Sequence, residues 1–387
     1  MDWLFTSESV SCGHPDKVAD AISDSILDAY LEQDKDSKVA VETLVTTDKV
    51  IIAWEVKSKA KVDIEPIVRE TIKEIWYTNE NEWFNYKTCD IECFIHSQSN
   101  DISIWVEKED EDEQGAWDQW MMFWYATNET ENGMPLTIDL ANKMLLQLRG
   151  CKESFIRPDA KSQITVEYRE WKPVRIDTVL MSIMHTEEVN QEQLKEYVTE
   201  NVIKKVIHDN NLENMFTDTK ILVNPTWRFV IWWPNGDTWL TWRKIIVDTY
   251  WGWWAHWWGA FSWKDPSKVD RSGAYFARYI AKNLVKAWVC DKCLIQVSYA
   301  IWVAEPVSIY INTYWTAKIP LTDKEIAQKI KDNFSFKPKY IEKKLNLRQP
   351  MYKKTSSYGH YGRKWKENEF TWEVENLTDE IKNVFNF

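Results

Sequence analysis

A short run near the start of the chain combines residue types that suit phosphate and metal chemistry. In "GHPDK", residues 13–17, His14 precedes a helix that Pro15 can begin, and Asp16 lies in its first turn. The free N–H groups at a helix N-terminus favour anions. His14 could therefore donate a hydrogen bond to a phosphate-ester oxygen while Asp16 holds a divalent cation, although a histidine at this position is more often only a helix cap.

Further basic and acidic residues recur in apolar, turn-rich segments. In "RPDAKSQ", residues 157–163, Asp159 could bind a ribose hydroxyl or an amine and Lys161 a phosphate, or both could belong to an ordinary loop with a surface ion pair. Residues 224–271 add Arg228, Asp237, Arg243, Lys244, Lys264, Lys268 and Asp270. Cations and carboxylates at this density predict a site that holds a polyphosphate with metal ions and stabilises charge as it leaves.

Other kinds of catalytic centre are not indicated. The sequence has no Ser–His–Asp or Cys–His set that suggests a covalent nucleophile, and no GxxxxGK[ST] phosphate loop. Cys290 and Cys293 have metal-ligand spacing, but no second pair accompanies them. This favours two reduced thiols at the start of a strand.

The elements that must position these residues alternate along the whole chain. Apolar spacing predicts helices over residues 15–30, 65–76, 136–149, 190–208, 266–287 and 322–333. Strands are predicted over 38–46, 50–56, 90–96, 162–169, 173–184, 227–231, 294–302 and 307–313. Each third of the chain mixes helices with strands, which predicts an α+β fold of three similar units. The acidic run at 107–115 is either a solvated loop or a mobile lid over a site.

Composition narrows the class of protein and reveals one anomaly. The net charge of −12 argues against nucleic acid or an anionic membrane as partner, and neither a signal peptide nor a long apolar run is visible, which predicts a cytoplasmic protein. A chain of 387 residues should contain about 27 glycines at ordinary usage. It contains 10 glycines and 25 tryptophans, so the glycine deficit and the tryptophan excess suggest one cause.

Long runs of the sequence resemble the S-adenosylmethionine synthetase family. They include "LFTSESVSCGHPDKVADAISD", "DEQGAWDQWMMFWYATNET", "RPDAKSQ", "HWWGAFSWKDPSKVDRSGAY" and "QVSYAIWVAEP", and the resemblance covers about residues 3–372. It implies three similar α/β domains related by pseudo-threefold symmetry, with mixed sheets covered by helices, at residues 1–101, 113–229 and 230–372. It also implies that S-adenosylmethionine is formed from ATP and L-methionine, and that tripolyphosphate is cleaved to phosphate and diphosphate.

The resemblance further implies cofactors, partners and site residues. Two Mg²⁺ per site and K⁺ are expected, in a homodimer or homotetramer with shared active sites and without nucleic acid or membrane. The expected catalytic residues are His14, Lys161, Arg243 and Lys264. ATP contacts are expected from His14, Asp159, Lys161, Arg228, Phe229, Asp237, Arg243, Lys244, Ala260 and Lys264; methionine contacts from Glu55, Gln98, Asp118, Asp237 and Lys268; Mg²⁺ ligation from Asp16 and Asp270; and K⁺ ligation from Glu42.

The departures from the family pattern are systematic. Tryptophan stands where the family has glycine at Trp54, Trp117, Trp120, Trp124, Trp227, Trp232, Trp233, Trp239, Trp242, Trp251, Trp254, Trp257, Trp258, Trp263, Trp288, Trp302 and Trp315. Overpacking and backbone strain at so many sites would exceed an ordinary stability of about 5–15 kcal/mol. We therefore hypothesise that a codon which the source organism reads as glycine, most simply UGA, has been translated as tryptophan.

Two other interpretations of the same residues are open. A phosphotransferase would use the same cations on ATP but would place phosphate on an acceptor. Tryptophans taken literally, beside arginine and lysine, could instead stack on single-stranded nucleic acid or a sugar. The net charge of −12 and the match to glycine positions count against this second interpretation.

Overall fold

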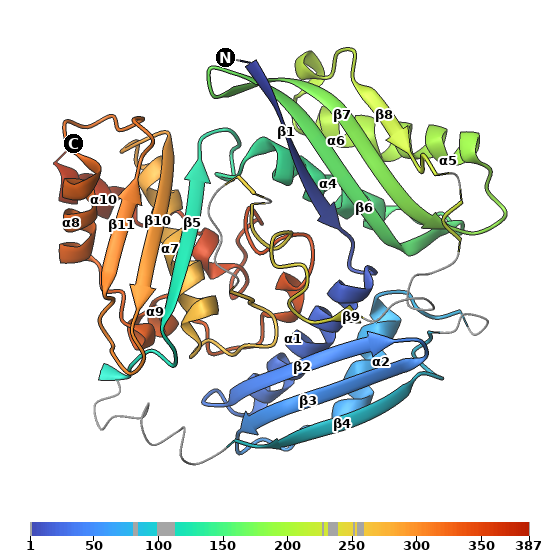
Figure 1. The fold of residues 1–387 in the computed structure, drawn as a ribbon, viewed down its shortest axis with the longest axis horizontal. Coiled ribbons are helices and arrows are strands. Elements are labelled where there is room, and N and C mark those ends of the chain that lie inside the picture. Colours follow the sequence, from blue (N-terminus) through green and yellow to red (C-terminus); the bar gives the residue numbers. More distant parts are fainter. Residues whose placement is uncertain are drawn as a thin grey trace.

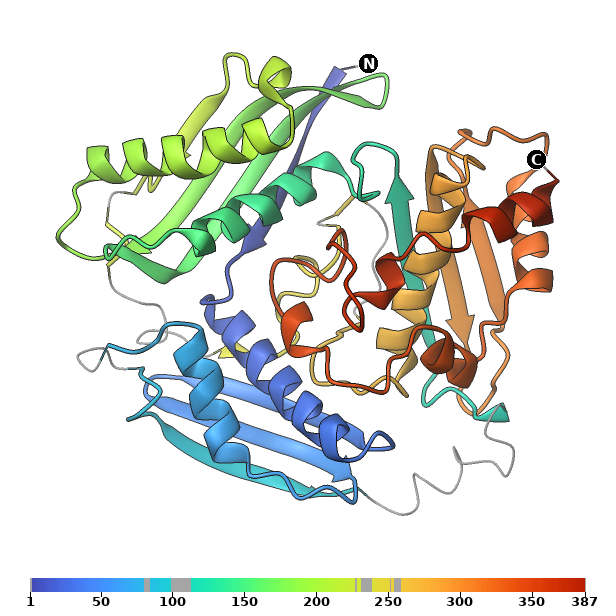
Figure 2. The ribbon, with the colours of Figure 1, turned by 180° about the vertical axis from the view of Figure 1, so that it is seen from behind.

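Three sheets and their helices build the molecule. The computed structural model describes residues 2–79, 84–98, 113–226, 228–230, 239–250, 252–253 and 259–386. In these residues the strand orders are β1-β6-β7-β8, β11-β10-β5 and β4-β3-β2-β9. The three sheets surround a central region that α1 enters, and their helices lie behind them (Figures 1 and 2). The predicted α+β fold, with mixed sheets flanked by helices, is confirmed.

The bounds of the strands and helices are as follows. The strands are β1 (Asp2–Val10), β2 (Lys38–Thr46), β3 (Lys49–Lys57), β4 (Asp90–Ser97), β5 (Trp120–Thr127), β6 (Ile156–Arg169), β7 (Lys172–His185), β8 (Lys220–Val223), β9 (Trp239–Leu240), β10 (Lys292–Tyr299) and β11 (Ser308–Asn312). The helices are α1 (Pro15–Gln33), α2 (Ile64–Glu74), α4 (Leu136–Gly150), α5 (Gln191–Val198), α6 (Lys205–Asp209), α7 (Val269–Lys286), α8 (Asp323–Asn333), α9 (Pro338–Lys344) and α10 (Thr378–Phe385).

Each sheet takes a strand from another third of the chain. β1 pairs antiparallel with β6, β5 pairs antiparallel with β10, and β9 adds to β2 at Leu44 and Val45. The exchange brings distant segments together at the sheet ends, and Val10 at the end of β1 lies opposite Lys161. The three sheets therefore depend on one another, while the predicted domain boundaries stay a prediction.

Local patterning accounts for most elements, with two differences. The predicted helix over 190–208 is one helical run that contains a π-helical segment, Thr199–Lys204, between α5 and α6. The predicted strand over 227–231 is wrong for its described residues, because 228–230 are not in a strand. Phe229 instead accepts a backbone hydrogen bond from His185 at 2.9 Å, which attaches this segment to the end of β7.

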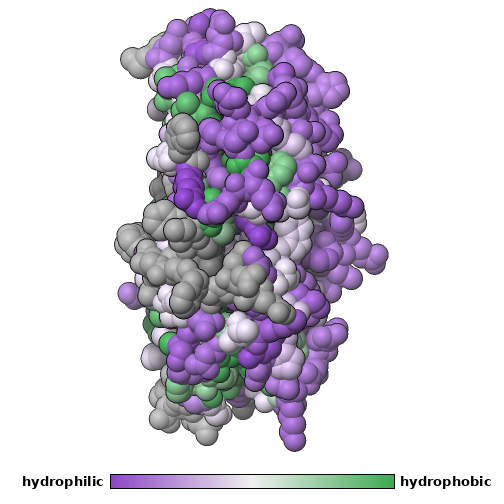
Figure 3. All heavy atoms as spheres, turned by 90° about the vertical axis from the view of Figure 1, so that its right-hand side faces the viewer, coloured by the Kyte–Doolittle hydropathy of each residue, from purple (hydrophilic) through white to green (hydrophobic). Residues whose placement is uncertain are grey.

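One face of the molecule is mainly polar. Figure 3 shows one face on which hydrophilic side chains predominate and hydrophobic ones form small separate patches. Across the described residues, none of the helices has both the length and the hydrophobicity that membrane crossing needs.

Among the residues that the structure describes, eight tryptophans adopt left-handed backbone conformations, with φ between +59° and +111°. They are Trp54, Trp76, Trp171, Trp242, Trp263, Trp288, Trp302 and Trp315, called here the left-handed tryptophans. Trp171 follows Glu170 in the β6–β7 hairpin turn, where both residues have positive φ, as a type I′ turn requires. Trp288 follows the C-cap of α7, where helices commonly end on glycine.

The side chains of these tryptophans gain little from burial. Trp315 is 98% exposed and Trp288 is 65% exposed. A large aromatic ring usually contributes stability through buried area, and a left-handed conformation costs an L-residue about 1–2 kcal/mol. These positions therefore have a backbone conformation that favours glycine, and most of their indole rings bury little area.

Candidate active site

His14 begins the site at the N-terminus of α1. Its Nδ1 accepts a hydrogen bond from the Asp16 backbone N–H at 3.2 Å, so the capping interpretation is confirmed. Burial, with Lys244 and Lys161 nearby, holds the pKa of His14 well below its ordinary value. A neutral imidazole whose Nδ1 accepts carries its proton on Nε2. His14 thus presents an N–H donor and no positive charge.

Asp16 connects this helix start to a distant loop. Its carboxylate is fully buried and accepts from the Leu240 backbone N–H at 3.3 Å and from Lys244 Nζ at 2.6 Å. Lys244 is therefore held beside the residue expected to bind Mg²⁺. The ion pair places a cation and a carboxylate where a metal–phosphate group would need both.

Asp159 and Lys161 reach the same region from β6. Asp159 is buried, and its Oδ1 lacks a hydrogen-bond partner. Burial raises the pKa of Asp159 to about 7, although Lys161 and Lys244 oppose this shift. An orphaned buried carboxylate oxygen is costly unless a ligand supplies a donor, as a ribose hydroxyl or an amine would. We call His14, Asp16, Asp159, Lys161, Arg243 and Lys244 the His14 cluster.

A second group of predicted residues lines a pocket of about 590 Å³, called here the Lys264 pocket. Its predicted members are Glu42, Glu55, Asp118, Ala260, Lys264, Lys268 and Asp270. Lys264 Nζ forms an ion pair with Asp270 Oδ2, while Asp270 Oδ1 is buried without a hydrogen-bond partner. Burial raises the pKa of Asp270 despite this ion pair. The free oxygen is available to a metal ion or a donor.

The residues expected to contact the substrate L-methionine differ in the hydrogen bonds and ion pairs that they form within the protein. Gln98 Nε2 donates to Glu55 Oε1 at 2.9 Å, and Gln98 Oε1 is buried without a partner. Lys268 Nζ pairs with Asp265 at 2.6 Å. Lys268 would therefore have to share its charge between Asp265 and a substrate carboxylate.

Tryptophan rings lie directly on the cations of both groups. Trp54, Trp117, Trp120, Trp242 and Trp263 line the Lys264 pocket. Lys264 Nζ is 4.8 Å from the Trp263 ring centroid, and Lys268 Nζ is 5.0 Å from that of Trp117. In the His14 cluster, Trp239 lies 5.2 Å from the His14 ring. The indoles thus occupy space beside the groups that a nucleotide or methionine would contact.

Several of these indole rings also have a buried N–H group without a hydrogen-bond partner. The indole N–H groups of Trp120, Trp239 and Trp263 are buried without a hydrogen-bond partner. By contrast, Trp253 Nε1 donates to Thr137 at 2.8 Å and Trp372 Nε1 donates to the His360 carbonyl at 2.9 Å. A buried polar group without a partner costs about 1–3 kcal/mol. Trp120, Trp239 and Trp263 therefore differ from Trp253 and Trp372, whose buried indole N–H groups have hydrogen-bond partners.

Some predicted residues lie elsewhere. Arg228 forms an exposed ion pair with Glu187, and Phe229 donates from its backbone N–H to His185 Nε2 at 3.3 Å. Neither residue lines the Lys264 pocket. Asp237 falls outside the described residues, as does the acidic run up to residue 112.

The carboxylates suit Mg²⁺ in one specific way. In the parts of the chain that the structure describes, three or more His, Cys, Asp or Glu side chains nowhere converge as a metal cage. Mg²⁺ normally keeps several waters and binds through one or two carboxylates plus substrate phosphates. Asp16 and Asp270, each beside a lysine, fit that donor set.

Cys290 and Cys293 are buried free thiols at the start of β10.

Sequence reasoning missed the buried charges behind the site. Asp20 and Asp24 follow Asp16 at helical spacing, and both are buried on α1. Arg271 binds Asp24 through two hydrogen bonds of 2.8 Å. The signal was present, because carboxylates at every fourth position of a helix that is otherwise buried need partners from another segment.

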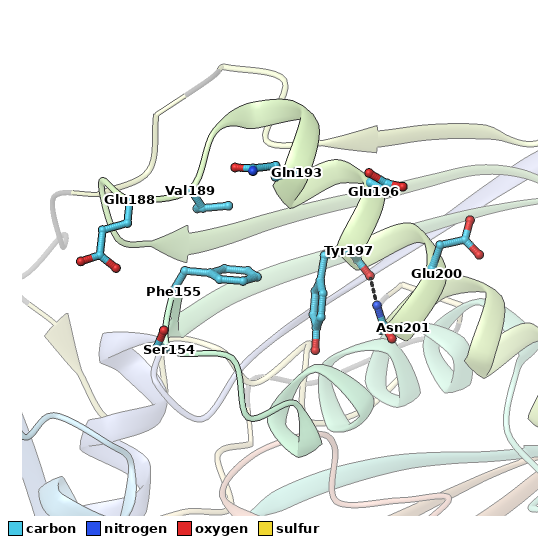
Figure 4. Close-up of a pocket in the computed structure, with 9 residues that line it drawn as sticks. All are labelled: Ser154, Phe155, Glu188, Val189, Gln193, Glu196, Tyr197, Glu200 and Asn201. Atoms are coloured by element: carbon cyan, nitrogen blue, oxygen red, sulfur yellow. Dashed lines mark hydrogen bonds between the residues drawn. The ribbon is translucent and has the colours of Figure 1, made fainter.

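A different pocket, of about 480 Å³, opens beside α5 (Figure 4). Its lining residues are Ser154, Phe155, Glu188, Val189, Gln193, Glu196, Tyr197, Glu200 and Asn201. Three carboxylates and the absence of any lysine, arginine or histidine among these residues make it repel phosphate. The His14 cluster and the Lys264 pocket, by contrast, contain the cations that a polyphosphate would need.

The fold and site therefore define an α/β protein with a cation-rich, carboxylate-bearing site for a phosphorylated ligand. Comparison with known proteins agrees. Family models described as the N-terminal, central and C-terminal domains of S-adenosylmethionine synthetase match residues 2–100, 113–229 and 231–374. The chain belongs to the S-adenosylmethionine synthetase family.

Full-length relatives support the same assignment. The S-adenosylmethionine synthase of Parabacteroides distasonis is 49% identical over 426 aligned positions, with 100% of both chains covered. Those of Phocaeicola vulgatus and Flavobacterium johnsoniae are each 50% identical, again with 100% of both chains covered. The similarity thus extends through all three matched regions.

Proposed function

We propose that the His14 cluster and the Lys264 pocket carry out the family's reaction, the transfer of the adenosyl group of ATP to L-methionine. The chain is a methionine adenosyltransferase by family, which makes S-adenosylmethionine. The observation that carries the site assignment is the buried His14 at the N-terminus of α1, beside the ion pair between Asp16 and Lys244. This arrangement offers an uncharged N–H donor within a cationic surface that suits a triphosphate.

The chemistry needs orientation and charge neutralisation. The methionine sulfur is a neutral thioether, so it attacks C5′ of ATP without a general base. The C5′–O bond breaks and the triphosphate leaves with the electron pair. The Nε2–H of His14 donates to that leaving oxygen, and Lys161, Arg243, Lys244 and Lys264 neutralise the phosphates. The same cations stabilise the tripolyphosphate while water attacks one phosphorus and the bridging P–O bond breaks to give phosphate and diphosphate.

We assign the remaining roles from the family resemblance. Asp159 holds the nucleotide through its orphaned oxygen, together with Arg228, Phe229, Asp237 and Ala260. Methionine is held by Glu55, Gln98, Asp118, Asp237 and Lys268. The free oxygen of Asp270 supports the assignment of that residue as a ligand.

The metals have specific proposed ligands. Asp16 and Asp270 would hold two Mg²⁺ ions, and Glu42 would hold K⁺. Magnesium, when bound, would neutralise phosphate charge and orient the phosphate oxygens.

Assembly and symmetry are part of the proposal. The predicted residues divide into two groups, and the Lys264 pocket includes neither His14 nor Lys161. This division supports a homodimer, or a dimer of dimers, in which each active site draws on two protomers. The three sheet-and-helix units would be related by pseudo-threefold symmetry, and the protein would act in the cytoplasm.

The proposed activity requires glycine where tryptophan now blocks the site. We infer that the natural protein has glycine at the left-handed tryptophans and at the other family glycine positions. Support comes from the left-handed φ values, from the exposed rings, and from the unpartnered N–H groups of Trp120, Trp239 and Trp263. Trp76 and Trp171 extend the set beyond the positions found by resemblance.

The direct test is product formation by the chain with glycine at all these positions. It should convert ATP and methionine to a sulfonium product that requires magnesium, detected by mass spectrometry. Phosphate transfer to an acceptor, without a sulfonium product, would favour the phosphotransferase alternative. A folded protein that forms neither product would reject the proposed function.

A further inference from the structure

Helix α1 bears aspartates at four successive turns of one face. They are Asp16, Asp20, Asp24 and Asp28, and the first three are at most 1% exposed. Each carboxylate accepts hydrogen bonds from backbone N–H groups more than 200 residues away in the chain. Four carboxylates with the same type of partner, three of them fully buried, indicate a shared role, which Asp16 alone does not explain.

Asp20 binds the loop that carries two of the phosphate cations. Its Oδ1 accepts from the Trp242 backbone N–H at 3.2 Å, directly before Arg243 and Lys244. Its Oδ2 accepts from Lys17 Nζ at 2.9 Å. The Thr241 N–H donates to the Thr43 carbonyl of β2 at 3.0 Å, and residues 242–250 then form turns without a regular helix or strand, where Asp20 holds the start of the segment.

Asp24 binds the loop that carries Lys264. It accepts from the Trp263 backbone N–H at 3.1 Å and from Ser262 Oγ at 3.0 Å. Arg271, which Asp24 also holds, donates to the Lys264 carbonyl at 3.1 Å. Asp24 therefore acts together with the bridge between Lys264 and Ala40 of β2 to fix the backbone on both sides of the Lys264 side chain.

The backbone at both contact points is left-handed. Trp242 has φ of +67° and Trp263 has φ of +74°. Each of these residues donates its N–H to an aspartate of α1. At each loop, the left-handed backbone thus directs an N–H group to a carboxylate of α1.

We propose that Asp20 and Asp24 are positioning residues for the adenosyl transfer, which set the two cation-bearing loops in register with His14 and Asp16 on the same helix. The inference rests on the proposed function. One rigid helix would then fix the leaving-oxygen donor and the phosphate cations relative to one another. Misplacement by about 1 Å in such an arrangement can cost about 10²-fold in rate.

Asp28 provides a matched control on the same face. It accepts from the backbone N–H groups of Met351, Tyr352 and Lys353 at 2.9–3.0 Å. That segment contains none of the predicted site residues. Replacing Asp28 removes the same kind of contact from a loop without phosphate-binding cations.

The experiment compares Asp20→Ala, Asp20→Asn and Asp28→Ala in the glycine-bearing protein. Steady-state kinetics give kcat and both KM values, calorimetry gives affinity for inorganic tripolyphosphate, and urea unfolding gives stability. Asp20→Ala should lower kcat/KM for ATP by about 10- to 100-fold and weaken tripolyphosphate binding, with KM for methionine unchanged. Asp20→Asn keeps an acceptor oxygen for the Trp242 N–H and should recover part of the loss.

Asp28→Ala should lower the free energy of unfolding about as much as Asp20→Ala does. Its kcat and tripolyphosphate affinity should stay within about twofold of the parent. A folded Asp24→Asn protein should show the same losses of kcat/KM for ATP and of tripolyphosphate affinity as Asp20→Ala, since Arg271 then lacks a fully charged partner. Activity losses that simply follow stability in all variants, Asp28→Ala included, would overturn the proposal. If the parent forms no product while Asp20→Ala still weakens tripolyphosphate binding, the proposed function fails and the positioning role stands.

Discussion

Replacing the left-handed tryptophans by glycine should stabilise the chain. Trp315→Gly is the clearest single change, because that side chain is 98% exposed and its removal sacrifices almost no buried area. A left-handed conformation costs an L-residue about 1–2 kcal/mol, whereas glycine adopts it freely but loses about 0.5–1 kcal/mol in chain entropy. The expected gain from Trp315→Gly is therefore about 0.5–1 kcal/mol in the free energy of unfolding.

The gain should accumulate across the set. Most of the eight positions are spread over turns and element ends, so their changes should add, whereas Trp54, Trp242 and Trp263 line one pocket and their changes should couple. All eight replacements should then contribute about 4–8 kcal/mol. Trp54, with φ of +111°, lies outside the ordinary left-handed region and should contribute more than the average position.

Urea unfolding measures this gain, and Trp372→Gly is its matched control. Trp372 is fully buried, stacks on Tyr275 at 3.6 Å between ring centroids, and does not have positive φ. Its replacement should destabilise the protein by about 3–5 kcal/mol, as expected for loss of a buried aromatic ring. If Trp315→Gly and the eightfold variant lose stability as Trp372→Gly does, the tryptophans are native residues and the glycine inference is refuted.

Three further predictions concern the site in the glycine-bearing protein. His14→Ala should lower kcat by about 10²–10³-fold with little change in KM for ATP, because it removes a donor to the leaving oxygen; an unchanged single-turnover rate would exclude that role. Asp16→Asn and Asp270→Asn should each raise the magnesium concentration needed for half-maximal turnover, and identical magnesium titrations in both variants would show that neither is a ligand. Burial raises the pKa of Asp159 from 3.8 to about 7, so the folded state retains a proton that the unfolded chain has lost. The contribution of Asp159 to the free energy of unfolding should therefore decrease as the pH rises from 3.8 to about 7. Asp159→Asn should remove that part of the pH dependence, as measured by urea unfolding across this range.

Local patterning predicted the elements that build the site. Apolar spacing placed α1 and the start at Pro15, and the run at 38–46 is β2. These elements could be predicted because their own residues determine the helical or alternating period. The pairing of β1 with β6 could not, because strand exchange depends on contacts between segments more than 150 residues apart.

The site residues were predictable as a chemical inventory but not as an arrangement. Resemblance named His14, Lys161 and Lys264, yet only the structure divides them between a cluster and a pocket. The buried pairing of Lys268 with Asp265 and the orphaned oxygen of Asp159 arise from tertiary packing. Backbone dihedral angles likewise identify Trp76 and Trp171 as glycine-type positions without any family comparison.

The most direct test of the account is the identity of these residues in the protein purified from its source organism. Peptide mass spectrometry should cover Trp288, Trp302 and Trp315, together with residues 250–263, and the gene should be sequenced to identify each codon. The account predicts glycine at the left-handed positions and at 257 and 258, each encoded by one reassigned codon. Tryptophan at these positions in the natural protein would contradict it.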